Sequence, residues 1–142
     1  MKATEVAAQN PKALVIGADQ ILVLGKKWFD KPENMRAARA QLLALRGQTH
    51  VLETAAVCQR GDVCVWRHVS RPQLTMRAFS EKFLDEYLAR EGKAVLSSVG
   101  AYRLEGMGVQ LFERIEGDHF AILGLPLLPL LAYLRATNML AV

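Results

Sequence analysis

The stretch KALVIGADQILVLGKKWFDKP, residues 12–32, decides how the rest of the chain is interpreted. Its first apolar run ends in Gly17, and the acid Asp19 follows two residues later. A second apolar run, Ile21–Leu24, leads through a turn toward Lys31. An acid at the end of a buried strand, with a lysine returned by a hairpin, offers groups for phosphate or metal chemistry. An ordinary hairpin with a capped end is the alternative at this point, because acids at strand ends are common in loops.

Length and composition predict one globular domain. The chain has 142 residues, of which 51% are hydrophobic and 23% charged. This length is enough to bury a substantial core, so we expect a single domain over residues 1–142. The net charge of +4 suits an anionic ligand. Like charges do not gather into a block, and we therefore expect no nucleic-acid partner.

The cysteines and the apolar segments give an expectation for location. Cys58 and Cys64 make neither a disulfide framework nor a zinc site, and reduced thiols are typical of a cytoplasmic chain. Residues 1–11 lack the apolar core of a signal peptide. The longest apolar stretch, Phe120–Leu134, is shorter than the roughly 20 residues of a membrane span and contains glycine and proline. We expect a cytoplasmic protein without a membrane partner.

Hydrophobic periodicity and turn residues predict a mixture of helices and strands. The predicted helices are Lys2–Gln9, a helix that opens at Lys31-Pro32 and stops at Gly47, Ser80–Glu91 and Pro126–Arg135. The predicted strands are Ala13–Gly17, Ile21–Leu24, His50–Gln59, Val63–Val69, Leu74–Ala78, Val109–Ile115 and Phe120–Leu123. This pattern indicates one α/β domain in which helices sandwich a mixed, partly parallel sheet. Ligands of such sheets lie beyond the strand ends, which is where Asp19 is expected.

The segment SSVGAYRLEGMGVQLF, residues 97–112, is punctuated by glycine. Gly106 and Gly108 would let the backbone approach a ligand closely. A simple β-bulge would use the same residues. A single G-x-G pattern does not choose between these two interpretations.

Seven short motifs, taken together, resemble the Maf family of nucleoside triphosphate pyrophosphatases. They occur in family order and extend over nearly the whole chain. The matching residues are Lys2-Ala3, G-A-D-Q at Gly17–Gln20, K-P at Lys31-Pro32, L-R-G-x-x-H at Leu45–His50, E-G-x-G at Glu105–Gly108, G-D at Gly117-Asp118 and G-L-P-L at Gly124–Leu127. Each motif alone is weak, but their common order is hard to explain by chance. The resemblance implies an α/β fold of the Maf and ITPase-like type.

One departure from the family pattern concerns the start of the chain. Family members begin with a strand and a Ser-x-Ser-Pro-x-Arg-type loop whose hydroxyls and arginine hold the phosphates, and no such stretch occurs here. We therefore expect an N-terminally truncated Maf-like chain. The alternative to an enzyme is a weak or inactive chain that serves as a binding or regulatory module or is a gene remnant. The unpaired sheet edge left by a missing strand leads us to expect a homodimer.

The resemblance implies hydrolysis of a nucleoside triphosphate to the monophosphate and pyrophosphate with a divalent cation, Mg²⁺ or Mn²⁺. Such chemistry depends mostly on positioning and charge neutralisation. Asp19 matches the family's catalytic acid, which acts as the water-activating base and touches the metal. Lys2 and Lys31 match lysines that reach phosphate oxygens, where a flexible point charge suits a moving polyphosphate. A solvated surface lysine is the alternative role for both.

Gln20 and Glu105 match the positions that separate substrate branches of the family. The branch that hydrolyses dTTP and UTP usually carries Thr after the acid and Gln before the glycine pair, so this chain resembles the branch acting on 7-methyl-GTP. An ionised glutamate only accepts hydrogen bonds, which suits the paired donors of guanine at N1 and N2. The positive charge of a 7-methylated base would further favour a carboxylate. A salt bridge from Glu105 to Arg103 is the alternative role.

Overall fold

The computed structural model describes residues 2–142, and its backbone divides into two compact units. Unit 1 comprises the residues up to Gln20, together with Thr54–Arg71 and Asp118–Val142. Unit 2 comprises Ile21–Glu53 and Pro72–Gly117. Each unit is therefore assembled from segments that are far apart in the sequence.

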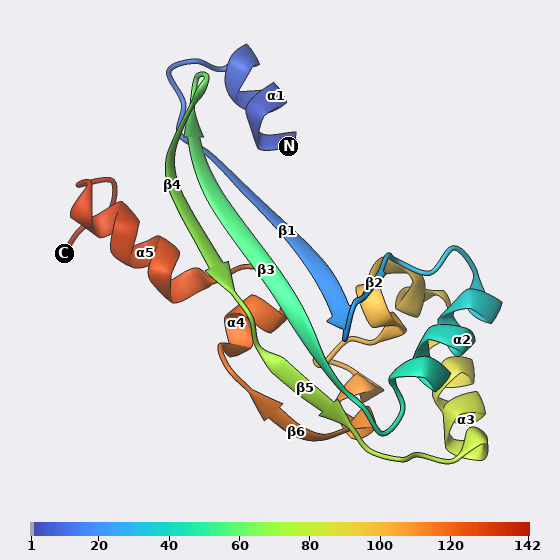
Figure 1. The fold of residues 1–142 in the computed structure, drawn as a ribbon. Coiled ribbons are helices and arrows are strands. Elements are labelled where there is room, and N and C mark those ends of the chain that lie inside the picture. Colours follow the sequence, from blue (N-terminus) through green and yellow to red (C-terminus); the bar gives the residue numbers. More distant parts are fainter. Residues whose placement is uncertain (1) are drawn as a thin grey trace. The chain divides into compact units, whose positions relative to one another are not determined.

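A six-stranded sheet has the order β2-β1-β3-β5-β6, with β4 paired to β3 (Figure 1). The strands are β1 (Val15–Leu24), β2 (Lys27–Phe29), β3 (Thr49–Arg60), β4 (Val63–Ser70), β5 (Gln73–Met76) and β6 (Phe112–Glu116). The pairs β1–β2, β3–β4, β3–β5 and β5–β6 are all antiparallel. Tight turns suffice to join antiparallel strands, whereas a parallel pair needs a crossover of a dozen or more residues. The parallel component that the sequence predicted does not occur among these four pairs.

In unit 1, helices cover both faces of strand β1. The helix α1 (Lys2–Gln9) lies against Gly17, where an added Cβ would sit 2.6 Å from the Cβ of Ala3. The short helix α4 (His119–Ile122) accepts hydrogen bonds from the side chain of Gln20. Side chains alternate across a strand, so Gly17 and Gln20 face opposite sides of the sheet. This arrangement confirms the α/β sandwich.

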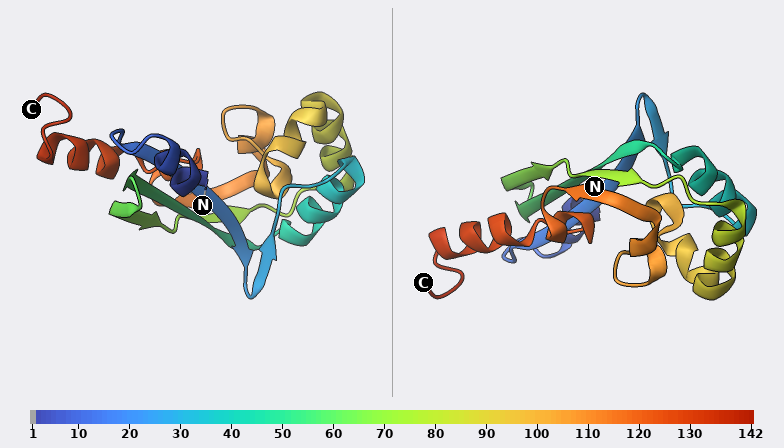
Figure 2. Two further views of the ribbon diagram at one scale, coloured as in Figure 1. Left: turned by 90° about the horizontal axis from the view of Figure 1, so that it is seen from above. Right: turned by 90° about the horizontal axis from the view of Figure 1, so that it is seen from below.

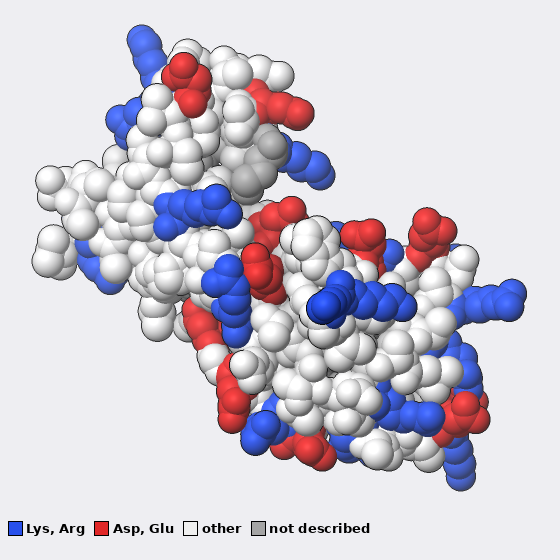
Figure 3. All heavy atoms as spheres, in the orientation of Figure 1, with Lys and Arg blue, Asp and Glu red and all other residues white. Residues whose placement is uncertain are grey.

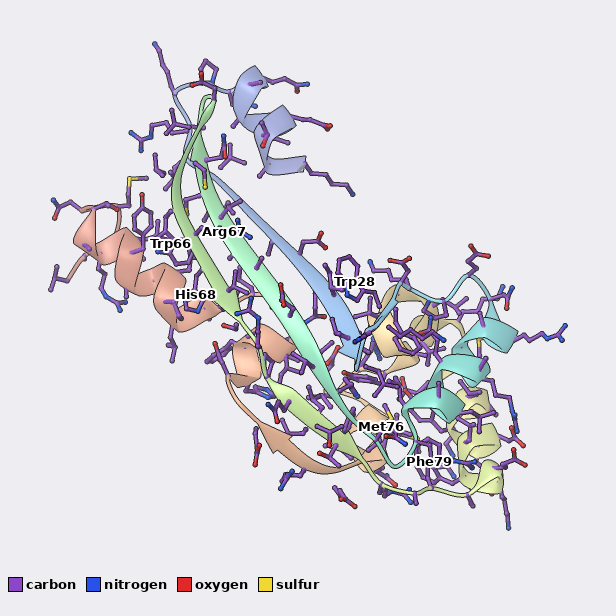
Figure 4. All side chains as sticks on the ribbon, in the orientation of Figure 1. Trp28, Trp66, Arg67, His68, Met76 and Phe79 are labelled. Atoms are coloured by element: carbon purple, nitrogen blue, oxygen red, sulfur yellow. The ribbon has the colours of Figure 1, made fainter. Side chains whose placement is uncertain are left out.

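The helix α5 (Leu127–Ala136) packs beside β4 in the same unit (Figure 4). The ring of Trp66 on β4 stacks on Tyr133 of α5 with centroids 5.4 Å apart. Trp66 also stacks on His68, two residues further along β4, at 6.0 Å. These aromatic contacts attach the last helix to the sheet. The predicted helix Pro126–Arg135 is confirmed.

In unit 2, the helices α2 (Met35–Leu45) and α3 (Glu81–Glu91) lie side by side (Figure 2). Their starts are capped by Asn34 and Ser80, whose side chains accept hydrogen bonds from backbone N–H groups of the first turn. Three 3-10 helices follow: η1 (Gly92–Ser97), η2 (Val99–Ala101) and η3 (Met107–Leu111). The core of this unit includes Leu22, Leu42, Leu45, Leu52, Leu74, Leu84, Tyr87 and Leu111.

The first correction to the predicted elements concerns β1. The two predicted strands Ala13–Gly17 and Ile21–Leu24 are one continuous strand, so Asp19 lies inside a strand and not at its end. Gly17 lies within the strand and not in a turn. The absence of a side chain at Gly17 makes room for α1. The side chain of Asp19 accepts a hydrogen bond from the backbone N–H of Gln20 without interrupting the strand.

The second correction concerns Phe120–Leu123, which was predicted as a strand and forms the helix α4. A short apolar run does not distinguish the two structures by periodicity. Asp118 caps the helix, because its Oδ1 accepts a hydrogen bond from Phe120 N at 2.9 Å. The predicted strand Val109–Ile115 is partly wrong for a similar reason, since its first residues belong to η3.

Within residues 2–142, no helix is both long enough and apolar enough to cross a bilayer. The hairpin of β3 and β4 confirms the predicted pairing on either side of Gly61. Cys58 is buried and Cys64 exposed, and both are free thiols.

Candidate functional site

Asp19 presents an exposed carboxylate from within β1. Its Oδ1 accepts a hydrogen bond from Gln20 N at 2.8 Å. An ionised carboxylate offers about four lone-pair sites, so this single bond leaves most of its acceptor capacity available. The side chain can therefore accept a proton from water or provide an oxygen ligand to a cation.

Lys2 belongs to α1, the helix that packs on the face of β1 to which Asp19 belongs. Ala3, the neighbour of Lys2, lies against Gly17. Asp19 follows Gly17 by two residues, which places it on the same side of the strand and about 7 Å further along. Both charged side chains are exposed. The close packing at Gly17 therefore brings α1, the helix that contains the predicted phosphate-binding Lys2, against the face of β1 that carries the predicted base.

Gln20 faces the opposite side and is held inside unit 1. Its Nε2 donates to Thr54 Oγ1 at 3.0 Å, to Ala121 O at 3.0 Å and to Ile122 O at 3.1 Å. Thr54, which is fully buried, donates its hydroxyl to Ala121 O at 2.8 Å. Carbonyl oxygens only accept hydrogen bonds, so the amide nitrogen is committed to α4. Gln20 has Oε1, an acceptor, left to offer to a ligand.

Lys31 and Glu105 lie in unit 2, and both side chains are exposed. Lys31 lies between β2 and α2, and Glu105 lies in the turn between η2 and η3. The structure thus places the predicted site residues in two groups. Lys2, Asp19 and Gln20 are in unit 1, whereas Lys31 and Glu105 are in unit 2.

Glu91, at the end of α3, is a residue that the sequence analysis missed. Its Oε1 accepts a hydrogen bond from Met107 N at 2.8 Å, and its Oε2 lies 3.7 Å from Nη2 of Arg103. Only 9% of its side chain is exposed. The ion-pair partner of Arg103 is therefore Glu91, and the alternative salt bridge from Glu105 was wrong. A glutamate at a helix end gave no local signal of this contact.

The two glycines of the E-G-x-G motif make room for the chain itself. A Cβ on Gly106 would lie 2.8 Å from Oε1 of Glu91. A Cβ on Gly108 would collide with the backbone of Arg103. Both glycines therefore lie against atoms of this chain, in a turn and a 3-10 helix, and close approach of this backbone to a ligand stays a prediction.

A buried polar cluster in unit 2 has a structural role. His50 Nε2 lies 2.8 Å from the hydroxyl of Tyr102, and burial lowers the pKa of His50 to about 4. The ring is therefore neutral at physiological pH. Tyr87 donates its hydroxyl to Ala101 O at 2.9 Å. Its pKa is raised by burial and by the nearby charge of Glu91.

The donors available for a divalent cation are few. Within residues 2–142, no group of three His, Cys, Asp or Glu side chains is placed to hold a metal ion. Among the predicted site residues of unit 1, Asp19 offers an exposed carboxylate oxygen. Mg²⁺ is commonly bound through one or two carboxylates, with waters and substrate phosphates completing its shell. The residues present fit a cation that is shared with a bound polyphosphate.

Charged side chains of both signs are interspersed on the face shown in Figure 3. Among the described residues drawn there, basic side chains do not form a continuous stripe. A separate cavity of about 280 Å³ lies beside α5 in unit 1. Its lining residues are Leu14, Arg60, Val65, Tyr133, Thr137 and Met139. The predicted site residues are not among them.

The sheet and the helices that cover it define an α/β protein, and β1 presents the exposed carboxylate of Asp19. A family model described as Maf-like protein matches residues 1–137. The chain belongs to the Maf family.

Similar proteins match almost the whole chain. A protein of Granulibacter bethesdensis named nucleoside triphosphate pyrophosphatase is 54% identical over 142 residues, which are 100% of this chain and 72% of the relative. One of Paramagnetospirillum magneticum with the same name is 58% identical over 135 residues, 95% of this chain and 70% of the relative. A protein of Brucella abortus named 7-methyl-GTP pyrophosphatase is 54% identical over 134 residues, 94% of this chain and 67% of the relative.

Proposed function

We propose that this chain is a nucleoside triphosphate pyrophosphatase, which hydrolyses the bond between the α- and β-phosphates. The observation that carries the proposal is the exposed carboxylate of Asp19 in the G-A-D-Q motif on β1. Family membership and the names of the relatives supply the class of reaction. The identity extends over the whole chain, which favours an enzyme over a binding module.

In this reaction, water adds to phosphorus, the α–β phosphoanhydride bond breaks, and the nucleoside monophosphate and pyrophosphate are released. Asp19 takes the proton of the attacking water. Lys2 and Lys31 bind phosphate oxygens and offset the negative charge that moves onto the leaving pyrophosphate. A divalent cation, when bound, supplies further charge neutralisation and makes water easier to deprotonate. The role of Asp19 as a metal ligand and the identity of the cation, Mg²⁺ or Mn²⁺, belong to this proposal.

For the substrate, we propose a purine nucleotide of the 7-methyl-GTP type. One relative at 54% identity carries that name. Glu105 is exposed, and Arg103 forms its ion pair with Glu91. The carboxylate of Glu105 therefore remains available as an acceptor. Gln20 offers Oε1 because its amide nitrogen is bound within unit 1. Glu105 and Gln20 each present an acceptor, the kind of group that suits an N–H donor of guanine.

A cytoplasmic location and a homodimer complete the proposal. The two free thiols support a reducing compartment. The homodimer rests on the sequence expectation, and a molar-mass measurement by light scattering in solution tests it.

The function is tested by pyrophosphate release from 7-methyl-GTP, GTP, dTTP and UTP with Mg²⁺. Asp19→Asn keeps Oδ1 for the bond from Gln20 N but loses the basic carboxylate. We expect it to lower kcat by about 10²–10⁴-fold. The matched control is Asp62→Asn, which changes an exposed aspartate in the same unit and should leave the rate unchanged.

Two results would contradict this proposal in different ways. Equal inactivity of the wild type and Asp19→Asn on all four nucleotides would reject the enzyme. A clear preference for dTTP would retain the enzyme and reject the roles of Gln20 and Glu105 in purine selection.

A further inference from the structure

The carboxylate of Glu91 contacts the chain on both sides of Glu105. Arg103 precedes Glu105 by two residues and pairs with Oε2 of Glu91, whereas Met107 follows it by two and donates its N–H to Oε1. Gly106 lies directly against the same carboxylate, where a Cβ would be 2.8 Å from Oε1. One largely buried carboxylate therefore contacts the residues on both sides of Glu105.

A second side chain of α3 holds the start of the same segment. Tyr87 is one helical turn before Glu91, so both project from the same face of α3. The Tyr87 hydroxyl donates to Ala101 O at 2.9 Å. The carbonyl of Ala101 and the N–H of Met107 are thus fixed to one helix, and Glu105 lies between them. Ala101 has a positive φ of 60°, which a non-glycine residue adopts only when its surroundings enforce it.

Glu91 is poorly placed for direct contact with a nucleotide. Its side chain is 9% exposed, and both oxygens already have partners in the loop. Glu105, by contrast, is exposed. Glu91 is therefore packed inside the protein, whereas Glu105 is exposed to solvent on the loop that Glu91 contacts.

We propose that Glu91 is a positioning residue for substrate selection, acting through the loop Arg103–Gly108 to set where the carboxylate of Glu105 meets the nucleobase. This inference rests on the proposed function of the chain. It assigns discrimination between nucleotides to a residue that does not touch them. Catalysis at Asp19 proceeds without it.

The test compares kcat and KM for 7-methyl-GTP and dTTP in Glu91→Ala, Glu91→Gln and the wild type. In Glu91→Ala, we expect the ratio of kcat/KM for the two nucleotides to fall at least 10-fold, through a higher KM for 7-methyl-GTP, while kcat changes less than 3-fold. Glu91→Gln keeps an acceptor for Met107 N and should recover an intermediate ratio. Glu86→Ala, on the exposed face of α3, is the matched control and should retain the wild-type ratio.

The double variant Glu91→Ala/Glu105→Gln separates positioning from general damage. If Glu91 acts only through Glu105, the double variant has the same nucleotide ratio as Glu105→Gln alone. Equal further loss for both nucleotides would indicate a merely structural role. Hydrogen exchange at the Met107 amide gives a readout that is independent of activity, and we expect it to be faster in Glu91→Ala than in Glu86→Ala.

The outcomes distinguish this inference from the function on which it rests. A wild type that releases no pyrophosphate from any nucleotide overturns the proposed function and the inference together. An active wild type whose nucleotide ratio is unchanged in Glu91→Ala overturns the inference alone. Unchanged exchange at Met107 also overturns it, because the loop would then not depend on Glu91.

Discussion

The residues Asp19 and Gln20 are neighbours in the sequence but face opposite sides of β1, because side chains alternate along a strand. Asp19 faces the side covered by α1, where its carboxylate is exposed. Gln20 faces α4 and uses its amide nitrogen there. A short motif can thus combine a solvent-exposed acid with a residue that fixes the fold. The motif identifies both residues as part of the family pattern. It does not reveal that their side chains lie on different faces of β1.

His50 gives a pH-dependent prediction at the same scale. Burial holds its pKa at about 4, below the ordinary value of 6.5, because the protonated ring would be removed from water. Between these values the unfolded chain binds a proton that the folded chain does not. The free energy of unfolding therefore decreases as the pH falls from 6.5 toward 4. Between pH 7.5 and pH 5, we expect His50 to contribute a loss of about 2 kcal/mol.

Urea unfolding at pH 7.5 and pH 5 measures this contribution. His50→Gln cannot titrate but can still form a hydrogen bond with the Tyr102 hydroxyl, so it should show a smaller loss between the two pH values than the wild type. His119→Gln changes an exposed histidine and should keep the wild-type dependence. Identical pH dependence in His50→Gln and the wild type would contradict the lowered pKa.

At the scale of elements, capping residues explain which helices could be predicted. Ser80 starts α3 where the sequence placed it, because a side-chain oxygen that accepts from the third residue of a helix is a local signal. Asp118 carries the same signal for α4, but the apolar run that follows it is only a few residues long. Such a run is assigned by its tertiary partners, which here are the side chains of Thr54 and Gln20. Those partners are 67 and more residues away in sequence.

The attachment of α4 to the sheet gives a prediction about Thr54 and Gln20. Thr54→Val keeps the shape of the side chain but removes the hydroxyl that donates to Ala121 O and accepts from Gln20. The change removes both hydrogen bonds of a buried hydroxyl, each of which contributes about 0.5–1.5 kcal/mol, so we expect a loss of about 1–3 kcal/mol in the free energy of unfolding. Combined with Gln20→Met, the two changes should be non-additive by roughly 1 kcal/mol because they share partners.

Urea unfolding of the single and double variants measures this coupling. The control pair is Thr54→Val with Gln41→Met, since Gln41 donates to Asp30 O elsewhere and shares no partner with Thr54. That pair should be additive within about 0.5 kcal/mol. Additivity of Thr54→Val with Gln20→Met would show that the hydrogen-bonded cluster is not one energetic group.

At the scale of the whole molecule, the family could be predicted from motifs in order, whereas the supporting contacts could not. Asp19, Lys31 and Glu105 are visible because each lies in a recognisable short pattern. Glu91 is not, because its contact with Met107 spans 16 residues and depends on how the loop folds back on α3. The sequence therefore indicates candidate ligand-binding side chains more readily than the side chains that hold them in place.

Nucleotide binding gives the prediction for the whole chain, because a ligand that binds only the folded state stabilises all of it. An α,β-methylene nucleoside triphosphate, which the enzyme cannot hydrolyse, should raise Tm when added with Mg²⁺. At 100 times its Kd the stabilisation is about 2.7 kcal/mol, which corresponds to roughly 10 °C for a domain of this size. The guanine analogue should raise Tm more than the thymine analogue at equal concentration. Removing Mg²⁺ with a chelator should reduce the rise in Tm. Asp19→Asn should lose the part of the rise that depends on the metal and keep the part that the lysines supply. A shift that is the same with and without Mg²⁺ would contradict the proposed cation, whereas equal shifts for the two bases would contradict purine selection by Glu105.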